Sequence, residues 1–176
     1  MLHKEKNVDL KIFNSLIKND TNPVLSNLFA ARDIKSIQDV DYSFDKLISP
    51  DLLKSGKDVA NLLIDKINRK EKIIIIGDYD VDGATATACA YLGLKKFGAN
   101  VDFIVPNRFK FGYGLTPEIV DLAYKKKPGL ILTVDNGIAS IEGVQKANTY
   151  GIDVVITDHH LPGDKLPNTK FIVNPN

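Results

Sequence analysis

Residues 72–83 read KIIIIGDYDVDG: an unbroken isoleucine run, then a glycine and three aspartates at alternate positions. More short apolar runs follow, and helical patterns lie between them. The strands we expect are 73–76, 101–105, 130–134, 154–157 and 171–173, and the helices that follow them are 84–97, 117–126 and 140–150. Continuous apolar strands that alternate with helices are typical of a parallel sheet buried on both faces. The sequence therefore predicts an α/β fold, a five-stranded parallel Rossmann-like sheet with helices on both faces.

The region before this sheet has a different texture. Residues 57–69 show the 3.6-residue period of an amphipathic helix that leads into the first strand, whereas residues 1–56 hold short apolar patches broken by Asn22-Pro23 and Ser49-Pro50. We therefore expect an N-terminal helical or irregular arm over 1–56 and an α/β domain over 57–176.

Composition excludes several classes of protein. The 176 residues carry 23 Lys and Arg against 22 Asp and Glu, so any contact with nucleic acid must come from a local basic patch. The single cysteine, Cys89, excludes an internal disulfide and a multi-cysteine zinc site. The sequence shows neither a signal peptide nor the roughly 20 apolar residues of a membrane span, so we expect a cytoplasmic protein.

The first strand is followed by Asp78, Asp80 and Asp82, three carboxylates within five residues. Like charges this close raise one another's pKa values and cost stability unless a cation lies among them. The alternative is that one aspartate caps the next helix and the others are solvated. An EF-hand is excluded, because its twelfth position would be Cys89 where a glutamate is needed.

Two more strand ends carry the same type of side chain. The third strand runs into Asp135-Asn136-Gly137, and the fourth into Asp158, His159 and His160. The carboxyl ends of parallel strands form one crevice, so these groups should converge with the first cluster. This requires the strand order 2-1-3-4-5. Carboxylates with one or two imidazoles suit Mn²⁺, and two such ions about 3.5–4 Å apart are the usual arrangement for hydrolysing phosphoesters.

A basic and aromatic loop follows the second strand, NRFKFGYG at 107–114. Single-strand grooves combine cations for the phosphates with aromatic faces for the bases. Arg108, Lys110 and Tyr113 are therefore candidates for binding nucleic acid, with Arg108 suited to grip a phosphate through two donors. Phe109 and Phe111 could instead pack the loop onto the sheet.

These motifs resemble the DHH phosphoesterase superfamily, and within it the bacterial exonucleases specific for single-stranded DNA. The motifs are GDYDVDG at 77–83, PNRFKFGYGL at 106–115, TVDNGIAS at 133–140, TDHHLPG at 157–163 and VNPN at 173–176. The resemblance implies a hydrolase dependent on two Mn²⁺ or Mg²⁺ ions that degrades single strands 5′→3′ in DNA repair and recombination. It also implies single-stranded DNA, a single-strand-binding protein and a helicase as partners, and no membrane.

The resemblance assigns roles residue by residue. It implies Asp80, Asp82, Asp135 and His159 as metal ligands, and Asp78, Asp158 and His160 as catalytic groups near the metals, with Asp158 orienting a histidine. Such exonucleases are several times longer than 176 residues, so we expect the DHH domain to be truncated at its C-terminal end and little activity from this chain alone.

Other functions remain open on the sequence alone. One is a catalytically incomplete nucleic-acid-binding fragment, and another is a different DHH phosphodiesterase or pyrophosphatase. A signalling receiver domain also has acidic residues after its first strand, but it needs a lysine near the end of its last strand, whereas Lys170 stands at the start.

Overall fold

The computed structural model describes residues 7–176, which form two compact units divided between Ile48 and Ser49. The first unit contains helices α1 (Leu10–Lys18) and α2 (Pro23–Ala30) and the short 3₁₀ helices η1 (Ile37–Val40) and η2 (Phe44–Lys46). Asp9 and Asn22 accept hydrogen bonds from N–H groups in the first turns of α1 and α2. The domain division expected at residue 56 stays a prediction.

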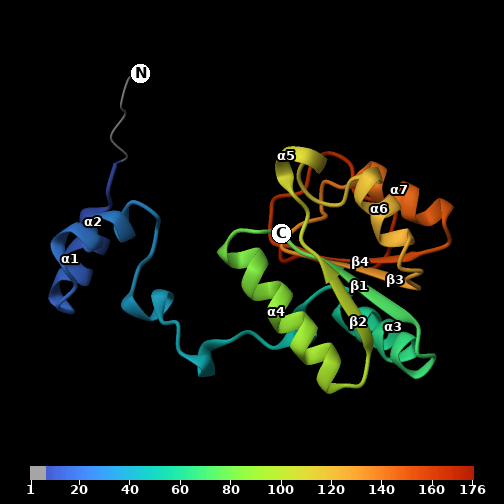
Figure 1. The fold of residues 1–176 in the computed structure, drawn as a ribbon. Coiled ribbons are helices and arrows are strands. Elements are labelled where there is room, and N and C mark those ends of the chain that lie inside the picture. The colour runs from blue at the N-terminus through green and yellow to red at the C-terminus, as the bar shows by residue number, and fades with distance from the viewer. Residues whose placement is uncertain (1–6) are drawn as a thin grey trace. The chain divides into compact units, whose positions relative to one another are not determined.

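The second unit alternates strands with helices, and Figure 1 shows its elements in place. Its strands are β1 (Lys72–Ile76), β2 (Asn100–Ile104), β3 (Leu130–Val134), β4 (Asp153–Thr157) and β5 (Ile172–Val173). Its helices are η3 (Pro50–Leu52), α3 (Gly56–Asn68), α4 (Val81–Lys96), α5 (Arg108–Phe111), α6 (Pro117–Tyr124) and α7 (Ile141–Thr149). The described residues contain no helix long and apolar enough to cross a membrane.

The sheet has the order β2-β1-β3-β4-β5, and every pair of neighbours is parallel. This confirms the predicted topology. The register pairs Ile76 with Thr133, and Thr133 with Ile156. The chain therefore leaves β1, β3 and β4 side by side at one edge of the sheet, where the three acidic motifs begin.

The sheet is buried on both faces because alternate strand residues serve two cores. Ile74 and Ile76 of β1 belong to a cluster with α6 and α7, while Ile73 and Ile75 belong to a second cluster with α3 and α4. Figure 1 shows the two helix layers on either side of the sheet. Four consecutive isoleucines are thus explained by burial on both faces.

One boundary differs from the sequence prediction. Helix α4 begins at Val81 and not near residue 84, because the Asp80 side chain caps it by accepting a hydrogen bond from the Gly83 N–H at 2.9 Å. The first turn of the helix therefore contains Asp82 and Gly83. A glycine discourages helix in a sequence pattern, but here its missing side chain lets the turn approach Asp78.

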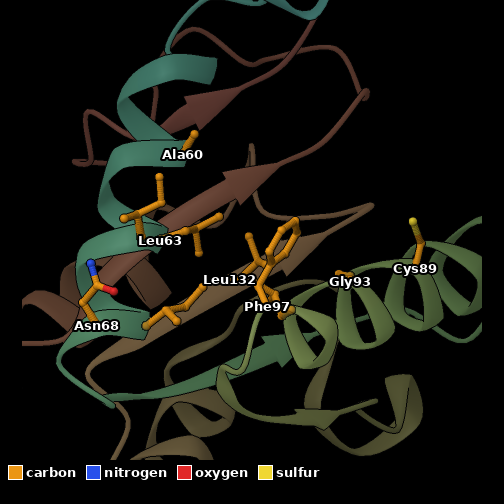
Figure 2. Close-up of a pocket in the computed structure, with 11 residues that line it drawn as sticks. Ala60, Leu63, Asn68, Cys89, Gly93, Phe97 and Leu132 are labelled. Carbon is orange, nitrogen blue, oxygen red and sulfur yellow. The ribbon is translucent and has the colours of Figure 1, made fainter.

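The α3–α4 face carries a hollow of about 580 Å³ above Leu132 of the sheet. Figure 2 shows Leu63 and Ala60 of α3 on one side, and Gly93 and Cys89 of α4 with Phe97 at the end of that helix on the other. Its lining is almost wholly apolar, in contrast to the polar edge formed by the strand ends.

Candidate metal centre

Asp78 is the most enclosed carboxylate after β1. It is buried, and its Oδ1 accepts a hydrogen bond from the Tyr79 N–H at 2.8 Å. A Cβ on Gly83 would lie 2.5 Å from the Cβ of Asp78, so only glycine allows the helix to start this close to the strand end. The sequence pattern DVDG therefore presses the first turn of α4 against Asp78.

Asp80 has two roles in the structure. As the cap of α4 it accepts the Gly83 N–H, and this bond is the main reason why the pKa of its carboxyl lies below the usual value. The positive charge of Arg108 adds to the effect. The alternative interpretation, that one of the three aspartates caps the next helix, is thus correct for Asp80. The cap uses Oδ1, and Oδ2 faces Arg108 at 3.7 Å.

Asp135 lies directly after β3 in a left-handed backbone conformation, with φ 60°. Burial raises the pKa of its carboxyl, and the negative charge of Asp80 raises it further. His159 opposes this, since its Nε2 lies 3.0 Å from Oδ1 of Asp135. A buried carboxylate with a raised pKa beside a second carboxylate is the electrostatic environment in which a cation is most favourable.

The fourth strand ends in Asp158, which organises the two histidines. Its Oδ1 accepts the backbone N–H of His159 and lies 2.7 Å from Nδ1 of His160, while its Oδ2 accepts the Ile138 N–H. Burial alone would raise the pKa of Asp158, but these hydrogen bonds outweigh it and the pKa is lowered. The same bond to Asp158 raises the pKa of His160. With Nδ1 held by Asp158, the Nε2 atom of His160 is left to bind a metal or substrate.

The strand ends bring together two overlapping sets of possible ligands. Within each set the ligand atoms all lie within 4.8 Å of one another: Asp78, Asp80 and Asp135 form one set, and Asp135, His159 and His160 the other. Asp135 is common to both. Carboxylate oxygens with imidazole nitrogens suit Mn²⁺, so the residues present fit the expected pair of divalent ions.

Asp82 stands apart from both sets. It is exposed on the first turn of α4, where it lines a shallow hollow with Asp135 and His159. Asp78 and His160, expected to act near the metals, belong to the sets themselves. The sequence motif gave no role to Asn136, which is buried and donates from Nδ2 to the backbone oxygens of Ile76 and Val134. An asparagine directly after the strand-end aspartate is the signal that could have found it.

The basic and aromatic loop lies over Asp78. The Arg108 Nη2 is 2.5 Å from Asp78 Oδ2, and this contact raises the pKa of the guanidinium. The guanidinium also lies between two rings, 4.4 Å from the centroid of Tyr79 and 4.9 Å from that of Tyr113. Contact with the two rings restricts the Arg108 side chain to one conformation.

The remaining loop residues divide between the site, the core and solvent. Tyr113 donates its hydroxyl to the Asp135 backbone oxygen, and burial with the nearby carboxylates raises its pKa to about 12. Phe111 packs against the α6–α7 core, whereas Phe109 is 99% exposed. Lys110 lies on α5 with its ammonium 5.2 Å from the Phe111 ring.

Comparison with known proteins identifies the family to which this chain is similar. Residues 72–176 match the model of the DHH family, N-terminal domain. The chain is 44% identical over 155 residues to the single-stranded-DNA-specific exonuclease RecJ of Escherichia coli K12, covering 88% of this chain and 27% of the relative. It is 40% identical over 172 residues to RecJ of Haemophilus influenzae, covering 97% and 29%.

The similar solved structures are also RecJ exonucleases. A crystal structure of exonuclease RecJ bound to manganese is 35% identical, with a TM-score of 0.67 over 73% of this chain and 33% of that one. RecJ of Thermus thermophilus in complex with Mn²⁺ is 28% identical, with a TM-score of 0.67 over 95% and 24%. The chain thus spans about 27% of the length of its E. coli relative. The expected resemblance to single-strand-specific exonucleases is confirmed, and the chain belongs to the DHH family.

Proposed function

We propose that this chain carries the metal-binding part of a divalent-metal-dependent exonuclease that hydrolyses single-stranded DNA 5′→3′ by a two-metal mechanism. The observation that carries the proposal is the position of Asp135, whose carboxylate belongs to both sets of possible ligands. A carboxylate common to two sites can bridge two ions. Asp135 would be the residue that the two ions share, and the ions, when bound, would supply a hydroxide nucleophile and stabilise the attacking and leaving oxygens of the phosphodiester.

We assign the metal ligands as Asp80, Asp82, Asp135 and His159, and the ions as Mn²⁺ or Mg²⁺. The similar structures of RecJ contain manganese, which supports manganese as the ion. Asp78 lies within the same cluster and so could contribute a ligand oxygen as well. Asp82 is exposed and belongs to neither set. To bind a metal, its carboxylate would have to move toward the cluster with the first turn of α4.

The remaining groups handle protons and the substrate. Asp158 is proposed to hold the Nδ1 proton of His160, which leaves Nε2 as the ring nitrogen free to accept a proton or bind a metal. Arg108, Lys110 and Tyr113 are proposed to contact the strand, with Arg108 on a phosphate next to the metals. Among these, only Arg108 and Tyr113 contact the cluster itself.

The cellular setting is proposed from the similarity to RecJ proteins. It comprises single-stranded DNA as substrate, the cytoplasm as location, and DNA repair and recombination as the process, with a single-strand-binding protein and a helicase as partners. The names of the relatives state the specificity for single-stranded DNA.

Manganese titration of the chain, followed by electron paramagnetic resonance, tests the metal centre directly. We expect two bound ions per chain and loss of at least one in Asp135→Asn. Asp164→Asn is the matched control, because Asp164 is an exposed aspartate outside both sets. Binding of no manganese by the chain, or equal binding by Asp135→Asn, would contradict the proposal.

Cleavage is tested with 5′-labelled single-stranded DNA under single-turnover conditions, with duplex DNA and inorganic pyrophosphate as alternative substrates. We expect slow, manganese-dependent release of 5′ nucleotides from single strands, abolished by Asp135→Asn and kept by Asp164→Asn. Hydrolysis of pyrophosphate in preference to single strands would replace the exonuclease assignment with the pyrophosphatase alternative.

A further inference from the structure

A further hollow, of about 550 Å³, adjoins the candidate metal centre outside the edge strand β2. At one end it is lined by Asp78 and Tyr79, and its walls include Tyr91 of α4 and Phe103 of β2. Asp78 therefore belongs both to this hollow and to the ligand cluster. A DNA strand bound at the metal centre would therefore pass close to this hollow.

The walls of the hollow are aromatic and open to solvent. The rings of Tyr91 and Phe103 are in edge-to-face contact, with centroids 5.5 Å apart and planes at 77°. Phe103 is 46% exposed and Tyr79 is 50% exposed. Tyr91 is partly buried against the α3–α4 core, so Tyr79 and Phe103 supply most of the accessible aromatic surface for a flat apolar ligand.

Positive charge borders the hollow at two places. The Arg108 guanidinium lies 4.4 Å from the ring centroid of Tyr79, at the end where Asp78 is. The Lys95 ammonium lies 5.7 Å from the ring centroid of Tyr91, farther along α4. Each of two rings in the wall thus has a cation beside it.

This order of cation, ring and cation matches the chemistry of a single strand. Its phosphates need cations, and its unpaired bases need aromatic faces on which to stack. In a duplex the bases are paired and stacked inside the helix, so they cannot reach such a hollow. A site of this kind would contribute affinity for single strands only.

We propose that the hollow lined by Tyr79, Tyr91 and Phe103 is a nucleobase-binding subsite. It takes a base of the single strand held at the metal centre, and Arg108 and Lys95 contact the phosphates on either side. The subsite rests on the proposed function, because it binds the substrate of the same centre. It adds a source of selectivity for single strands that the metal cluster cannot supply.

The variants Tyr91→Leu and Phe103→Leu remove one ring each and keep an apolar side chain in the wall. Tyr124→Leu is the matched control, since Tyr124 is a similarly exposed tyrosine, 49%, stacked on Tyr150 in the α6–α7 layer. Binding of a 5′-phosphorylated oligonucleotide is measured by fluorescence anisotropy with Ca²⁺ on the carboxylates. We expect about 5- to 100-fold weaker binding for the two subsite variants and no change for the control.

A series of oligonucleotides, each with one abasic position, locates the base in the subsite. At one position the abasic strand should bind the unaltered chain more weakly, and Phe103→Leu should add no further loss for that strand. Circular dichroism and thermal unfolding of each variant show whether it is folded. For a variant that fails to fold, photochemical cross-linking of a 5-iododeoxyuridine strand to the unaltered chain should label Tyr91 or Phe103.

The subsite is wrong if both leucine variants bind every strand as the unaltered chain does, or if cross-links avoid the two rings. In that case, loss of manganese in Asp135→Asn would still leave the proposed function standing. If the unaltered chain captures no single strand and Asp135→Asn keeps its manganese, the proposed function and the subsite both fail.

Discussion

The Arg108 guanidinium lies against the Asp78 carboxylate, with Nη2 2.5 Å from Oδ2, although the two residues are 30 positions apart in the chain. The pair places a fixed positive charge beside Asp78 and Asp80 at the carboxyl end of the sheet. It offsets part of their mutual repulsion, so the cluster can form before any ion is bound. The Nε of Arg108 is buried without a hydrogen-bond partner among the described residues.

Arg108→Ala should weaken the capture of single strands and reduce its salt dependence. For a single strand, the slope of log affinity against log salt falls by about 0.7 for each phosphate that the protein no longer neutralises. Manganese affinity should hold or rise, because a positive charge next to Asp78 and Asp80 is removed. Anisotropy titrations at several salt concentrations give the slope.

The matched control for this variant is Arg69→Ala, which removes the same charge from the exposed α3 surface, where Arg69 pairs with Asp65. It should change neither the slope nor metal binding. Equal loss of manganese and DNA in Arg108→Ala would instead show that Arg108 supports the loop and does not contact phosphate.

Asp135→Asn should leave the metal-free protein as stable as before, or slightly more stable. The substitution removes a buried charge that is close to Asp80, and asparagine tolerates the left-handed backbone at φ 60°. Asp135→Ala also loses the charge, but alanine in this conformation costs roughly 1 kcal/mol. Thermal unfolding in EDTA compares the two, and an alanine variant as stable as the asparagine variant would exclude the backbone effect.

Gly143→Ala should destabilise the protein by about 1–3 kcal/mol, the usual cost of overpacking. Gly143 lies in α7 where the helix touches the chain before α6, and a Cβ there would overlap the Leu115 carbonyl oxygen. Gly93→Ala in α4 is the opposite case, since a Cβ there meets nothing within 4 Å. It should stabilise by about 0.5–1 kcal/mol. Urea unfolding measures both, and the same sign for the two variants would contradict this account of the helix contact.

The ion pair between Asp102 and Lys126 should make a small, acid-sensitive contribution to stability. The Lys126 ammonium, 2.7 Å from Asp102 Oδ2, is the main cause of a lowered Asp102 pKa. A lowered pKa in the folded state adds stability above the unfolded value near 3.8 and loses it as the pH falls through the folded value. Asp102→Asn should therefore cost about 0.2–1 kcal/mol at pH 7, because the pair is exposed, and should cost nothing well below pH 3.8. An equal cost at both pH values would assign the effect to packing.

The amino-acid sequence by itself determined the sheet and the edge at which the site lies. Ile73 to Ile76 are apolar at every position, so the strand must be buried on both faces, and strands of that kind are parallel. In a parallel sheet all carboxyl ends meet at one edge, so Asp135 and His159 could be placed near Asp80 without coordinates. The local pattern, which depends on residues close together in the chain, and one rule of topology suffice for this much.

Only the tertiary structure decided which side chains touch. The contact of Arg108 with Asp78 depends on the path of a loop, and the exposure of Asp82 depends on where α4 begins. The hollow beside β2 exists because Tyr91 on a helix and Phe103 on a strand meet across the sheet edge. Contacts of this kind combine segments that are distant in sequence, and their geometry follows from packing over the whole domain, which no local period encodes.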